Sequence, residues 1–461
     1  MNTGANAAFW ATATGTAPLG FQWTFNGTAI PGATSPMLTV SDAQASDAGS
    51  YSVSVTNAAG TVSSDVAALT VDAAGTGAPA TLSFQPVSQT VSDGGTVVFN
   101  APAAGGGPAG SLRKGGAIST RAASAITYQW FLNAVAISGA THSTYVIHGA
   151  TAADNGSYTC VVTDAAGSVV SSPASLDVVA SASPGRLVDI SCRAQVGTGA
   201  GQLIAGYVLG GSGTSGSLPL LVRASGPALL PFGVAGVLQD PQLTLSSQAG
   251  LLASNSGWGG STQIASTASA VGAFAWNAAA SHDSALVESL APGAYTAQVA
   301  GASGDTGVAL AEVYDAGPAG PRALSAPRLV NISARASVGT GDGMLIAGFV
   351  IGGATSETVL IRASGPALAA FGVAGVLPDP ALRLLRSNGD GTSTLLGSNT
   401  GWGGDAQVAA EAALVGAFPW DSPGTADSAV LITLAPGSYT AEVYGAGGDT
   451  GVALVEVYEV P

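Results

Sequence analysis

Hydrophobic and polar residues alternate in short runs along this chain, and the runs end at Gly, Asn or Asp. Two examples are YTAQVAG at 295–301 and VALAEVY at 308–314. A period of two residues turns one face of a β-strand toward a core and the other toward solvent. Because Gly, Asn and Asp favour tight turns, these runs predict antiparallel strands in an all-β protein. In GPALLPFGVAGVL at 226–238, Gly and Pro permit only a helical turn between strands.

Two different segments each occur twice. Residues 21–64 align without a gap to residues 128–171, and residues 185–315 correspond closely to residues 327–461. Repeats of this length identify self-contained structural units. We therefore predict four tandem β-sandwich domains, which behave as semi-independent units because few contacts cross their linkers. The expected boundaries are 1–72, 80–180, 185–315 and 327–461.

The first pair of repeats carries a specific set of aromatic residues. Trp23 and Tyr51 in the first copy match Trp130 and Tyr158 in the second. This pattern resembles the I-set type of immunoglobulin-like domain in large secreted bacterial proteins. The resemblance implies that each Trp is the core residue of strand C. It also implies that each Tyr forms a tyrosine corner, in which its hydroxyl binds backbone at the E–F turn.

The pair departs from antibody domains at the disulfide. The strand F position is Val53 in the first copy and Cys160 in the second, while the strand B positions are Ala11 and Ala101. Neither copy can form the bridge, so packing alone must hold the two sheets together. We expect Cys160 to be a buried free thiol that acts as a small hydrophobic residue.

The ends and loops of the two copies also differ. The first copy starts at a B-strand-like run, so we expect that domain to be incomplete at its N-terminus. The second copy carries an insertion at about 103–124, with Arg113, Lys114 and Arg121 among glycines. This insertion is either a mobile excursion or a loop that contacts a ligand.

The second pair of repeats is similar to an uncharacterised tandem glycine-rich β-sandwich module found beside immunoglobulin-like domains in long exported bacterial proteins. Its LAPGAYT strand at 290–296 also resembles the closing strands of carbohydrate-binding jelly rolls, which is an analogy of fold only. The resemblance implies an extracellular or cell-surface location. The N-terminus of the chain has no signal-peptide pattern, so the signal would lie outside this sequence.

Charge and composition exclude several classes of partner. The net charge is −15, from 27 acidic and 12 scattered basic residues. Nucleic acids and anionic membrane surfaces require clustered basic residues, so neither is an expected partner. Apolar runs such as GQLIAGYVLGG at 201–211 are of strand length, and none reaches the ~18 residues of a membrane span. A glycan or a protein surface remains as a possible partner.

Catalytic patterns are absent from the sequence. The three histidines, His142, His148 and His282, are scattered and have no counterparts in the sister repeats. They fit no nucleophile–base or zinc pattern. GTGAG at 197–201 lacks the Lys and Ser/Thr of a phosphate loop, and we predict a hairpin loop between two strands there. We expect no enzymatic activity.

Calcium is the one metal that the sequence leaves open. Acidic residues recur at corresponding positions of both glycine-rich repeats, and carboxylate or amide oxygens on loops can bind calcium. The first candidates are Asp240 and Asp379, with Asn255 and Asn399. These acidic residues are spread singly along the chain, so turn-forming roles explain them equally well.

Arg223 and Arg362 occupy corresponding positions in RASGP segments of the two glycine-rich repeats. A buried arginine that clamps loop carbonyls or a carboxylate is the structural interpretation. A recognition arginine that binds a ligand is the alternative.

SNSGWGG at 254–260 returns as SNTGWGG at 398–404. Trp258 with Asn255, and Trp402 with Asn399, offer the flat ring and polar edge that sugar binding needs. The alternative is that each ring folds beneath its loop and caps the sandwich.

Together these features favour a non-catalytic extracellular or cell-surface protein for adhesion, spacing or display. The alternative is a carbohydrate-binding accessory region of a larger secreted enzyme.

Overall fold

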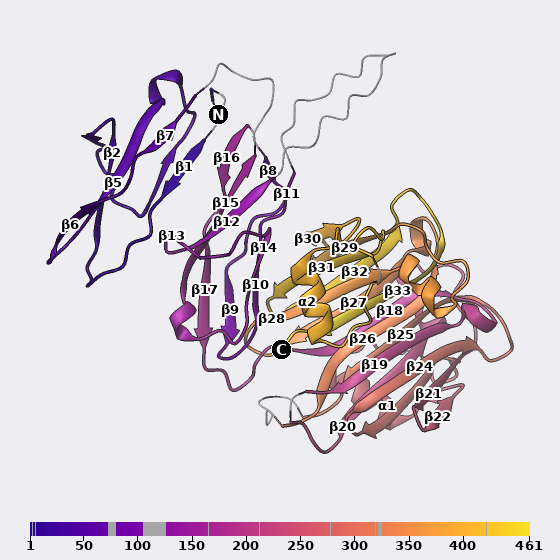
Figure 1. Ribbon diagram of the computed structural model, residues 1–461. Helices are drawn as coiled ribbons and strands as arrows, with labels where there is room; N and C mark the ends of the chain where they lie inside the picture. Colours follow the sequence, from indigo (N-terminus) through magenta and orange to yellow (C-terminus); the bar gives the residue numbers. More distant parts are fainter. Residues whose placement is uncertain are drawn as a thin grey trace, which may run out of the picture. The chain divides into compact units, whose positions relative to one another are not determined.

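The chain divides into two compact units of β-structure. The first contains Met1–Gln89, Val98–Ile147 and Thr151–Val178; the second contains Thr90–Val97, His148–Ala150 and Val179–Pro461. Figure 1 traces the strands of a computed structural model. The structure describes residues 1, 3–4, 6–71, 80–104, 126–164, 166–211, 213–276, 278–318, 320, 325–420 and 422–461. The predicted all-β class is confirmed.

The strands before residue 180 belong to the two immunoglobulin-like repeats. In the first repeat they are β1 (Ala7–Trp10), β2 (Gly20–Phe25), β3 (Thr28–Ala29), β4 (Met37–Val40), β5 (Gly49–Asn57), β6 (Gly60–Ser63) and β7 (Ala67–Leu69), with a 3-10 turn at Ala45–Asp47. In the second they are β8 (Thr81–Leu82), β9 (Gln89–Ser92), β10 (Val97–Asn100), β11 (Ala103–Ala104), β12 (Thr127–Leu132), β13 (Val135–Ala136), β14 (Thr144–Ile147), β15 (Gly156–Asp164), β16 (Gly167–Val170) and β17 (Ala174–Val179), with a 3-10 turn at Ala152–Asp154. Apart from Ala103–Ala104, the 103–124 insertion with its three basic residues lies outside the described residues.

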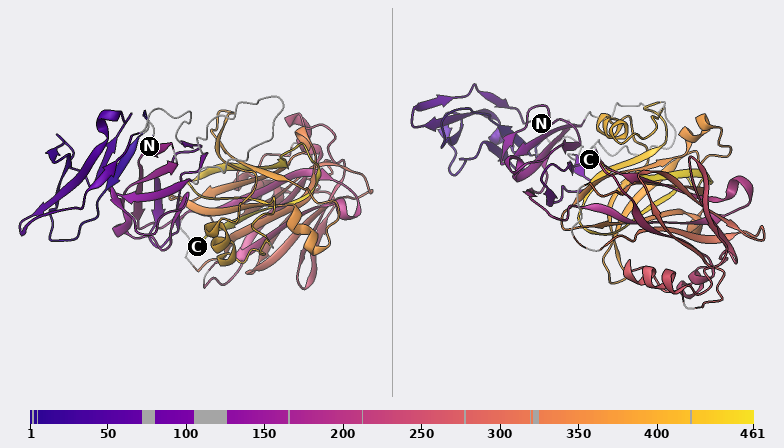
Figure 2. Two further views of the ribbon diagram at one scale, coloured as in Figure 1. Left: turned by 45° about the horizontal axis from the view of Figure 1, so that its top comes forward. Right: turned by 90° about the horizontal axis from the view of Figure 1, so that it is seen from below.

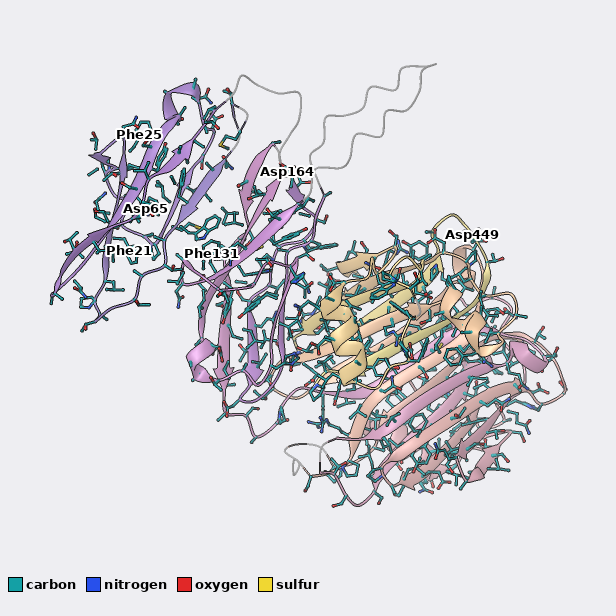
Figure 3. The ribbon with its side chains drawn as sticks, viewed as in Figure 1. Phe21, Phe25, Asp65, Phe131, Asp164 and Asp449 are labelled. Atoms are coloured by element: carbon teal, nitrogen blue, oxygen red, sulfur yellow. The ribbon has the colours of Figure 1, made fainter. Side chains whose placement is uncertain are left out.

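Aromatic side chains organise the core of the first immunoglobulin-like repeat. Trp23 in β2 is only 3% exposed, and its Nε1 donates to the carbonyl of Ser35 at 2.9 Å. The Tyr51 hydroxyl donates to the carbonyl of Asp47 at 2.9 Å, just before β5. Phe25, labelled in Figure 3, and Phe9 flank Tyr51 with ring centroids 4.9 and 4.5 Å away. The second repeat has the same pattern.

In that second repeat, Trp130 is fully buried and its Nε1 donates to the carbonyl of His142 at 2.9 Å. The Tyr158 hydroxyl donates to the carbonyl of Asp154 at 2.7 Å. Phe99 stacks on Tyr158 at 4.5 Å between centroids, in the core of a domain that has no disulfide. The prediction for Cys160 is confirmed: its thiol is free and buried, and burial raises its pKa to about 12.

The glycine-rich repeats supply the strands of the second unit from residue 186 onward. The first repeat contains β18 (Arg186–Val196), β19 (Leu203–Gly210), β20 (Leu218–Ser225), β21 (Pro241–Ser247), β22 (Gly250–Asn255), α1 (Thr262–Ala270), β23 (Ser284–Leu290), β24 (Gly293–Gly301) and β25 (Gly307–Asp315). The second contains β26 (Arg328–Val338), β27 (Leu345–Gly352), β28 (Glu357–Ser364), β29 (Pro380–Ser387), β30 (Ser393–Asn399), α2 (Ala406–Leu414), β31 (Ser428–Leu434), β32 (Gly437–Gly445) and β33 (Gly451–Glu459). Short 3-10 turns lie at Gly199–Gly201, Pro227–Phe232, Gly341–Gly343 and Pro366–Phe371, so the helical turn predicted at GPALLPF is confirmed.

These strands form two antiparallel ladders, and each ladder runs through both repeats. The first ladder has the order β23-β20-β25-β18-β27-β32-β29-β30. The second ladder has the order β31-β28-β33-β26-β19-β24-β21-β22. Two parallel bridges between β18 and β26 join them, so the described strands make one 16-stranded sheet. We call residues 185–461 the double module.

The two repeats exchange their first strands. β18 of the first repeat pairs with β27 of the second, and β26 of the second repeat pairs with β19 of the first. Each exchanged strand pairs along its other edge with the last strand of its own repeat, β25 or β33. The prediction that these two repeats behave as semi-independent units is therefore wrong. Alternation showed which residues are strands, but not which repeat would supply the neighbouring strand.

One core lies between the ladders and draws on both repeats. Leu187, Ile190 and Cys192 of β18 are all buried in it, and so are the corresponding residues of β26. Leu187 and Ile190 are three positions apart, which a regular strand would place on opposite faces. The pairing with β27 shifts register between Leu187 and Asp189, so Val188 forms a β-bulge and both apolar residues reach the core.

Each ladder carries one α-helix on its outer face. α1 contacts β20 and β23 of the first ladder, and α2 contacts β28 and β31 of the second, so the helices cover opposite faces of the double module (Figure 2). Ser261 caps α1 by accepting from the backbone of Ile264, and Asp405 caps α2 by accepting from Gln407 and Val408. Within the described parts of the chain, no helix combines the length and apolar character needed to cross a membrane.

Candidate functional site

A buried ion pair lies between the second and third strands of each ladder. Arg223 in β20 and Glu312 in β25 are directly opposite one another, with Arg223 Nε 3.0 Å from Glu312 Oε2. Their side chains are 1% and 2% exposed. Removing either partner would leave an uncompensated charge in a region of low polarity, which is strongly unfavourable. Glu312 lies on the face of β25 opposite to the core residues Ala311 and Val313, and it is buried there although it is charged.

Two aromatic rings contact the guanidinium group of Arg223. Its Cζ atom lies 4.4 Å from the ring centroid of Phe274 and 4.4 Å from that of Trp276. Its Nη1 donates to the carbonyl of Phe274 at 2.9 Å. Cation–π attraction is strongest where water is excluded, as it is here. Both faces of the guanidinium are thus occupied by the protein itself.

Hydroxyl groups complete this cluster. The Ser225 hydroxyl donates to Glu312 Oε2 at 3.1 Å and accepts from Trp276 Nε1 at 3.1 Å. The Tyr314 hydroxyl donates to Glu312 Oε1 at 2.7 Å. Burial raises the pKa of Glu312, and the charge of Arg223 opposes that rise. Arg223, Glu312 and their hydroxyl partners thus form a buried network within the protein.

The second repeat builds the same cluster. Arg362 lies opposite Glu456, with Nη1 3.6 Å from Oε2, and its Cζ lies 4.5 and 4.4 Å from the rings of Phe418 and Trp420. The Tyr458 hydroxyl donates to Glu456 Oε1 at 2.6 Å. These contacts are the ones that the structural interpretation of the two arginines requires. The sequence did not predict that aromatic rings contact these arginines. The two rings beside each arginine come from a VGAF segment, which occurs in both repeats, and from the residues that follow it.

One polar residue near the cluster differs between the repeats. Asp189 in β18 pairs with Tyr314 in β25, whereas Asn331 occupies the corresponding place in β26. Burial and the nearby Glu312 raise the pKa of Asp189 well above its ordinary value. The first repeat therefore has a carboxyl group with a raised pKa where the second has an amide.

The Trp258 loop folds against the double module. Trp258 is 9% exposed, its Nε1 donates to the carbonyl of Ala278 at 3.2 Å, and its backbone N–H donates to the carbonyl of Asp283 at 2.8 Å. Its ring meets Trp276 edge to face at 5.6 Å. Asn255 Oδ1 accepts from the backbone N–H groups of Gly257 and Ala285 at 3.0 and 3.3 Å. The ring thus has little surface for a sugar, and the amide oxygen is used within the fold.

Trp402 sits in the corresponding loop and is half-buried. Its Nε1 donates to Thr425 Oγ1 at 3.1 Å, and its ring meets Trp420 at 5.3 Å. Asn399 Oδ1 accepts from the backbone N–H groups of Gly401 and Ala429 at 3.1 and 3.2 Å. Each loop is thus held by the same kinds of internal contact.

Buried aspartates tie these loops to the 3-10 turns beside them. Asp283 Oδ1 accepts from the backbone N–H groups of Gly226 and Ala228 at 2.7 and 3.2 Å. Asp427 holds Gly365 and the residue two positions later in the same way. Both carboxylates are fully buried, so turn anchoring accounts for these repeated acidic positions.

The calcium candidates lie apart from such anchors. Asp240 forms a carboxyl–carboxylate hydrogen bond with Asp305, which lowers the pKa of Asp240 and raises that of Asp305. Asp449, the counterpart of Asp305, lies in the loop between β32 and β33 (Figure 3). Across the described ranges, no group of three or more His, Cys, Asp or Glu side chains has an arrangement that could hold a metal ion. Asp240 and Asp379 both stay untested candidates.

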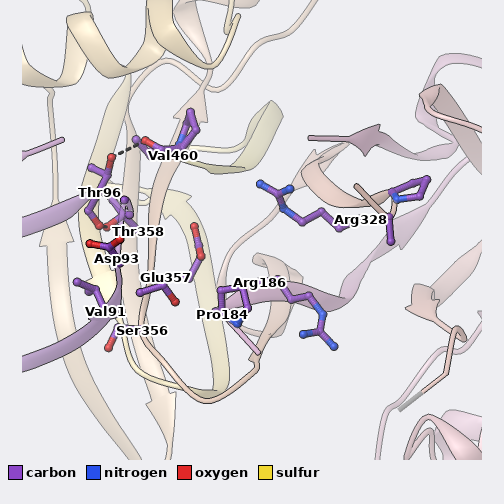
Figure 4. Close-up of a pocket in the computed structure, with 17 residues that line it drawn as sticks. Val91, Asp93, Thr96, Pro184, Arg186, Arg328, Ser356, Glu357, Thr358 and Val460 are labelled. Atoms are coloured by element: carbon purple, nitrogen blue, oxygen red, sulfur yellow. Dashed lines mark hydrogen bonds between the residues drawn. The ribbon is translucent and has the colours of Figure 1, made fainter. Parts of the chain in front are cut away.

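Two cavities of the second unit contain charged residues. One, of about 240 Å³, lies beneath α1 and is lined by Arg223, Trp258 and Trp276. The other, of about 420 Å³, has Arg186 and Arg328 on one side and Thr96, Thr358 and Val460 on the other (Figure 4). Arg328 Nε lies 2.7 Å from Oε2 of the buried Glu459, so this cation is paired inside the protein.

The comparisons with known proteins concern the immunoglobulin-like part of the chain. Residues 1–71 match the family model of the immunoglobulin I-set domain. The N-terminal Ig1-2 module of the Drosophila receptor protein tyrosine phosphatase DLAR is 21% identical over 39% of this chain and 92% of its own, with a TM-score of 0.24. Extracellular domains 3–5 of Drosophila OTK are 21% identical over 39% of this chain and 58% of their own, with a TM-score of 0.18. A comparison with curated proteins gave no match. Residues 1–71 are thus similar to the immunoglobulin I-set domain, and further all-β structure follows them.

Proposed function

We propose that this chain is a non-catalytic extracellular or cell-surface segment that displays the double module, in adhesion or a related surface role. The immunoglobulin I-set match of residues 1–71 supports the location, because such domains occur in extracellular regions of surface proteins. The double module supports the absence of catalysis, because the buried Arg, Glu and Tyr side chains of each cluster contact one another. A catalytic group must instead reach a substrate.

The observation that carries the proposal is the position of the first and last strands of the double module. The backbone N–H of Leu187 at the start of β18 donates to Oε1 of Glu459 at the end of β33, at 2.9 Å. The double module therefore begins and ends at one place. A spacer domain has its first and last strands at opposite ends, so that it adds its own length to the protein. The double module has both ends close together and therefore adds little length. Among adhesion, spacing and display, the geometry favours display of a rigid body.

Surface labelling of intact cells tests the proposal. Cells that make the protein would be stained with antibodies against the double module before and after permeabilisation. We expect equal staining in the two samples, because a displayed body is accessible from outside. Staining that requires permeabilisation would contradict the proposal.

A glycan array tests the carbohydrate-binding alternative with the full chain and the Trp258→Ala and Trp402→Ala variants. We expect no specific glycan signal from any of the three proteins. Both variants should melt at lower temperature, because each ring packs on a second tryptophan. A signal in the parent that both substitutions abolish without loss of folding would favour the alternative.

A further inference from the structure

The surface that joins the two repeats is complementary to itself. Seven residue pairs connect β18 to β27, and seven pairs at corresponding positions connect β19 to β26. Arg186 meets Gly352 in one ladder, and Arg328 meets Gly210 in the other. Each repeat thus contributes the same two strand edges to the interface: the edge of its first strand, β18 or β26, and the edge of its second strand, β19 or β27. This is the property of an isologous interface, which two identical subunits use when they form a symmetric dimer.

A close serine–glycine contact appears in both copies of the interface. Gly348 in β27 lies opposite Ser191 in β18, and a Cβ atom at Gly348 would sit 2.5 Å from Ser191 Oγ. Gly206 in β19 lies opposite Ser333 in β26, and a Cβ atom there would sit 2.7 Å from Ser333 Oγ. Each repeat has both the serine and the glycine, so each repeat fits any other copy of the repeat at this point.

The apolar pairs across the interface are interchangeable in the same way. Ile190 pairs with Phe349, and Ile332 pairs with Tyr207. All four side chains are nearly fully buried, and the two aromatic residues have similar shapes. A pairing within one chain and a pairing between two chains would therefore bury the same contacts at the same register.

We propose that two copies of this chain join by pairing the first glycine-rich repeat of each copy with the second glycine-rich repeat of the other. The product is a dimer with two double modules, each assembled from both chains. Because the contacts are identical in the closed monomer and in this dimer, chain concentration selects between them. Closure within one chain acts at an effective concentration on the order of millimolar, so a dilute chain closes on itself. Exchange requires the ladders to separate, so we expect it when chains fold at high concentration.

A disulfide that can form only between chains tests this proposal. Cys192 of β18 lies directly opposite Ala347 of β27, and antiparallel neighbours have Cα atoms within disulfide range. One chain carries Cys160→Val and keeps Cys192. The other carries Cys160→Val, Cys192→Ala and Ala347→Cys. Val53 and Ala334 occupy the positions that correspond to Cys160 and Cys192, so the sister repeats already contain these replacements.

The two chains would be unfolded together, refolded in a thiol–disulfide buffer at low and high concentration, and separated on a non-reducing gel. We expect a covalent heterodimer whose ratio to monomer rises about tenfold for each tenfold rise in concentration, while concentration stays below the effective value. A single chain with both Cys192 and Ala347→Cys is the matched control, and it should close its disulfide internally at low concentration. If the control closes and no heterodimer forms at high concentration, the proposal is overturned.

A second measurement decides the matter if the control fails to close. Two differently tagged chains with the unaltered sequence would be refolded together and captured through both tags in succession. We expect co-capture that increases with refolding concentration and survives dilution of the folded sample. Refolded chains that remain monomeric at every concentration would overturn the proposal.

Discussion

Adding one methyl group to β27 tests whether the double module is a single body. The substitution is Gly348→Ala, which places a Cβ atom 2.5 Å from Ser191 Oγ in the other repeat. Ordinary contact between these atoms requires roughly 3.4 Å or more, so either the serine rotates or β18 and β27 move apart. The backbone at Gly348 has no positive φ, so alanine introduces no backbone strain.

The expected cost combines two opposing effects. Overpacking of a closely fitted site costs about 1–3 kcal/mol, and the lower range applies because a serine hydroxyl can rotate. Replacing glycine reduces the entropy of the unfolded chain, which stabilises the fold by about 0.4–1 kcal/mol. We therefore expect Gly348→Ala to lower the free energy of unfolding by about 1 kcal/mol. In a Ser191→Ala background the clash disappears, and the same substitution should be neutral or stabilising.

Calorimetry of the parent, the two single variants and the double variant measures this coupling as a double-mutant cycle. For a body of this size, 1 kcal/mol corresponds to a shift of about 2–4 °C in the transition of the double module. Gly343→Ala is the matched control, because no atom lies within 4 Å of a Cβ built there. The reasoning is refuted if Gly348→Ala has the same effect with and without Ser191→Ala.

Three further predictions concern the same unit. Arg223→Met should lower its stability by about 3–5 kcal/mol because the charge of Glu312 is left unpaired, and Arg223→Met with Glu312→Leu should cost less than Arg223→Met alone; calorimetry would detect the reverse order. Because the folded pKa of Asp189 is raised, its contribution to stability is present below the ordinary carboxyl pKa and is lost as pH rises toward the folded value. The melting temperature should therefore fall as the pH rises above the ordinary carboxyl pKa, and Asp189→Asn should reduce that fall; an unchanged pH profile would contradict this assignment. A protease site placed within 319–324 should yield halves that remain together in size-exclusion chromatography after cleavage, whereas separate elution would contradict the shared sheet.

Local sequence patterns were sufficient to predict the strands and the immunoglobulin-like core. Alternation placed β24 and β25 correctly, and the matched Trp23 and Tyr51 lie buried where an immunoglobulin-like core has them. Such patterns depend on which side of a strand faces the core. That property is local, and it does not depend on which strand lies alongside.

Strand partners were not predictable for the same reason. β18 and β26 have the same sequence pattern, so each could pair with β19 or β27 and bury the same face. The hairpin predicted at 197–201 is wrong because the turn at Gly199–Gly201 carries the chain from β18 in the first ladder to β19 in the second. A short glycine turn joins strands of one ladder or of two ladders equally well, and the packing of the rest of the core decides between them.

The sequence predicted that Arg223 and Arg362 matter, but it did not predict which residues surround them. Arg223 was singled out because it recurs, but its partners Glu312 and Phe274 come from distant parts of the chain. Alternation gave no signal of the burial of Glu312, because its neighbours Ala311 and Val313 face the core and place it on the opposite face of β25.

The strand exchange has a consequence for how this protein can change over generations. Each copy of the repeat covers half of the other's core, so a gene that lost either copy would encode a strand edge and an apolar face with no cover. The two copies must therefore be inherited together. A change at Ser191 must also remain compatible with Gly348, although 156 intervening residues separate them in the chain (348 − 191 − 1). Duplicated segments usually diverge independently of one another. Here a change in one copy must remain compatible with the strands of the other copy.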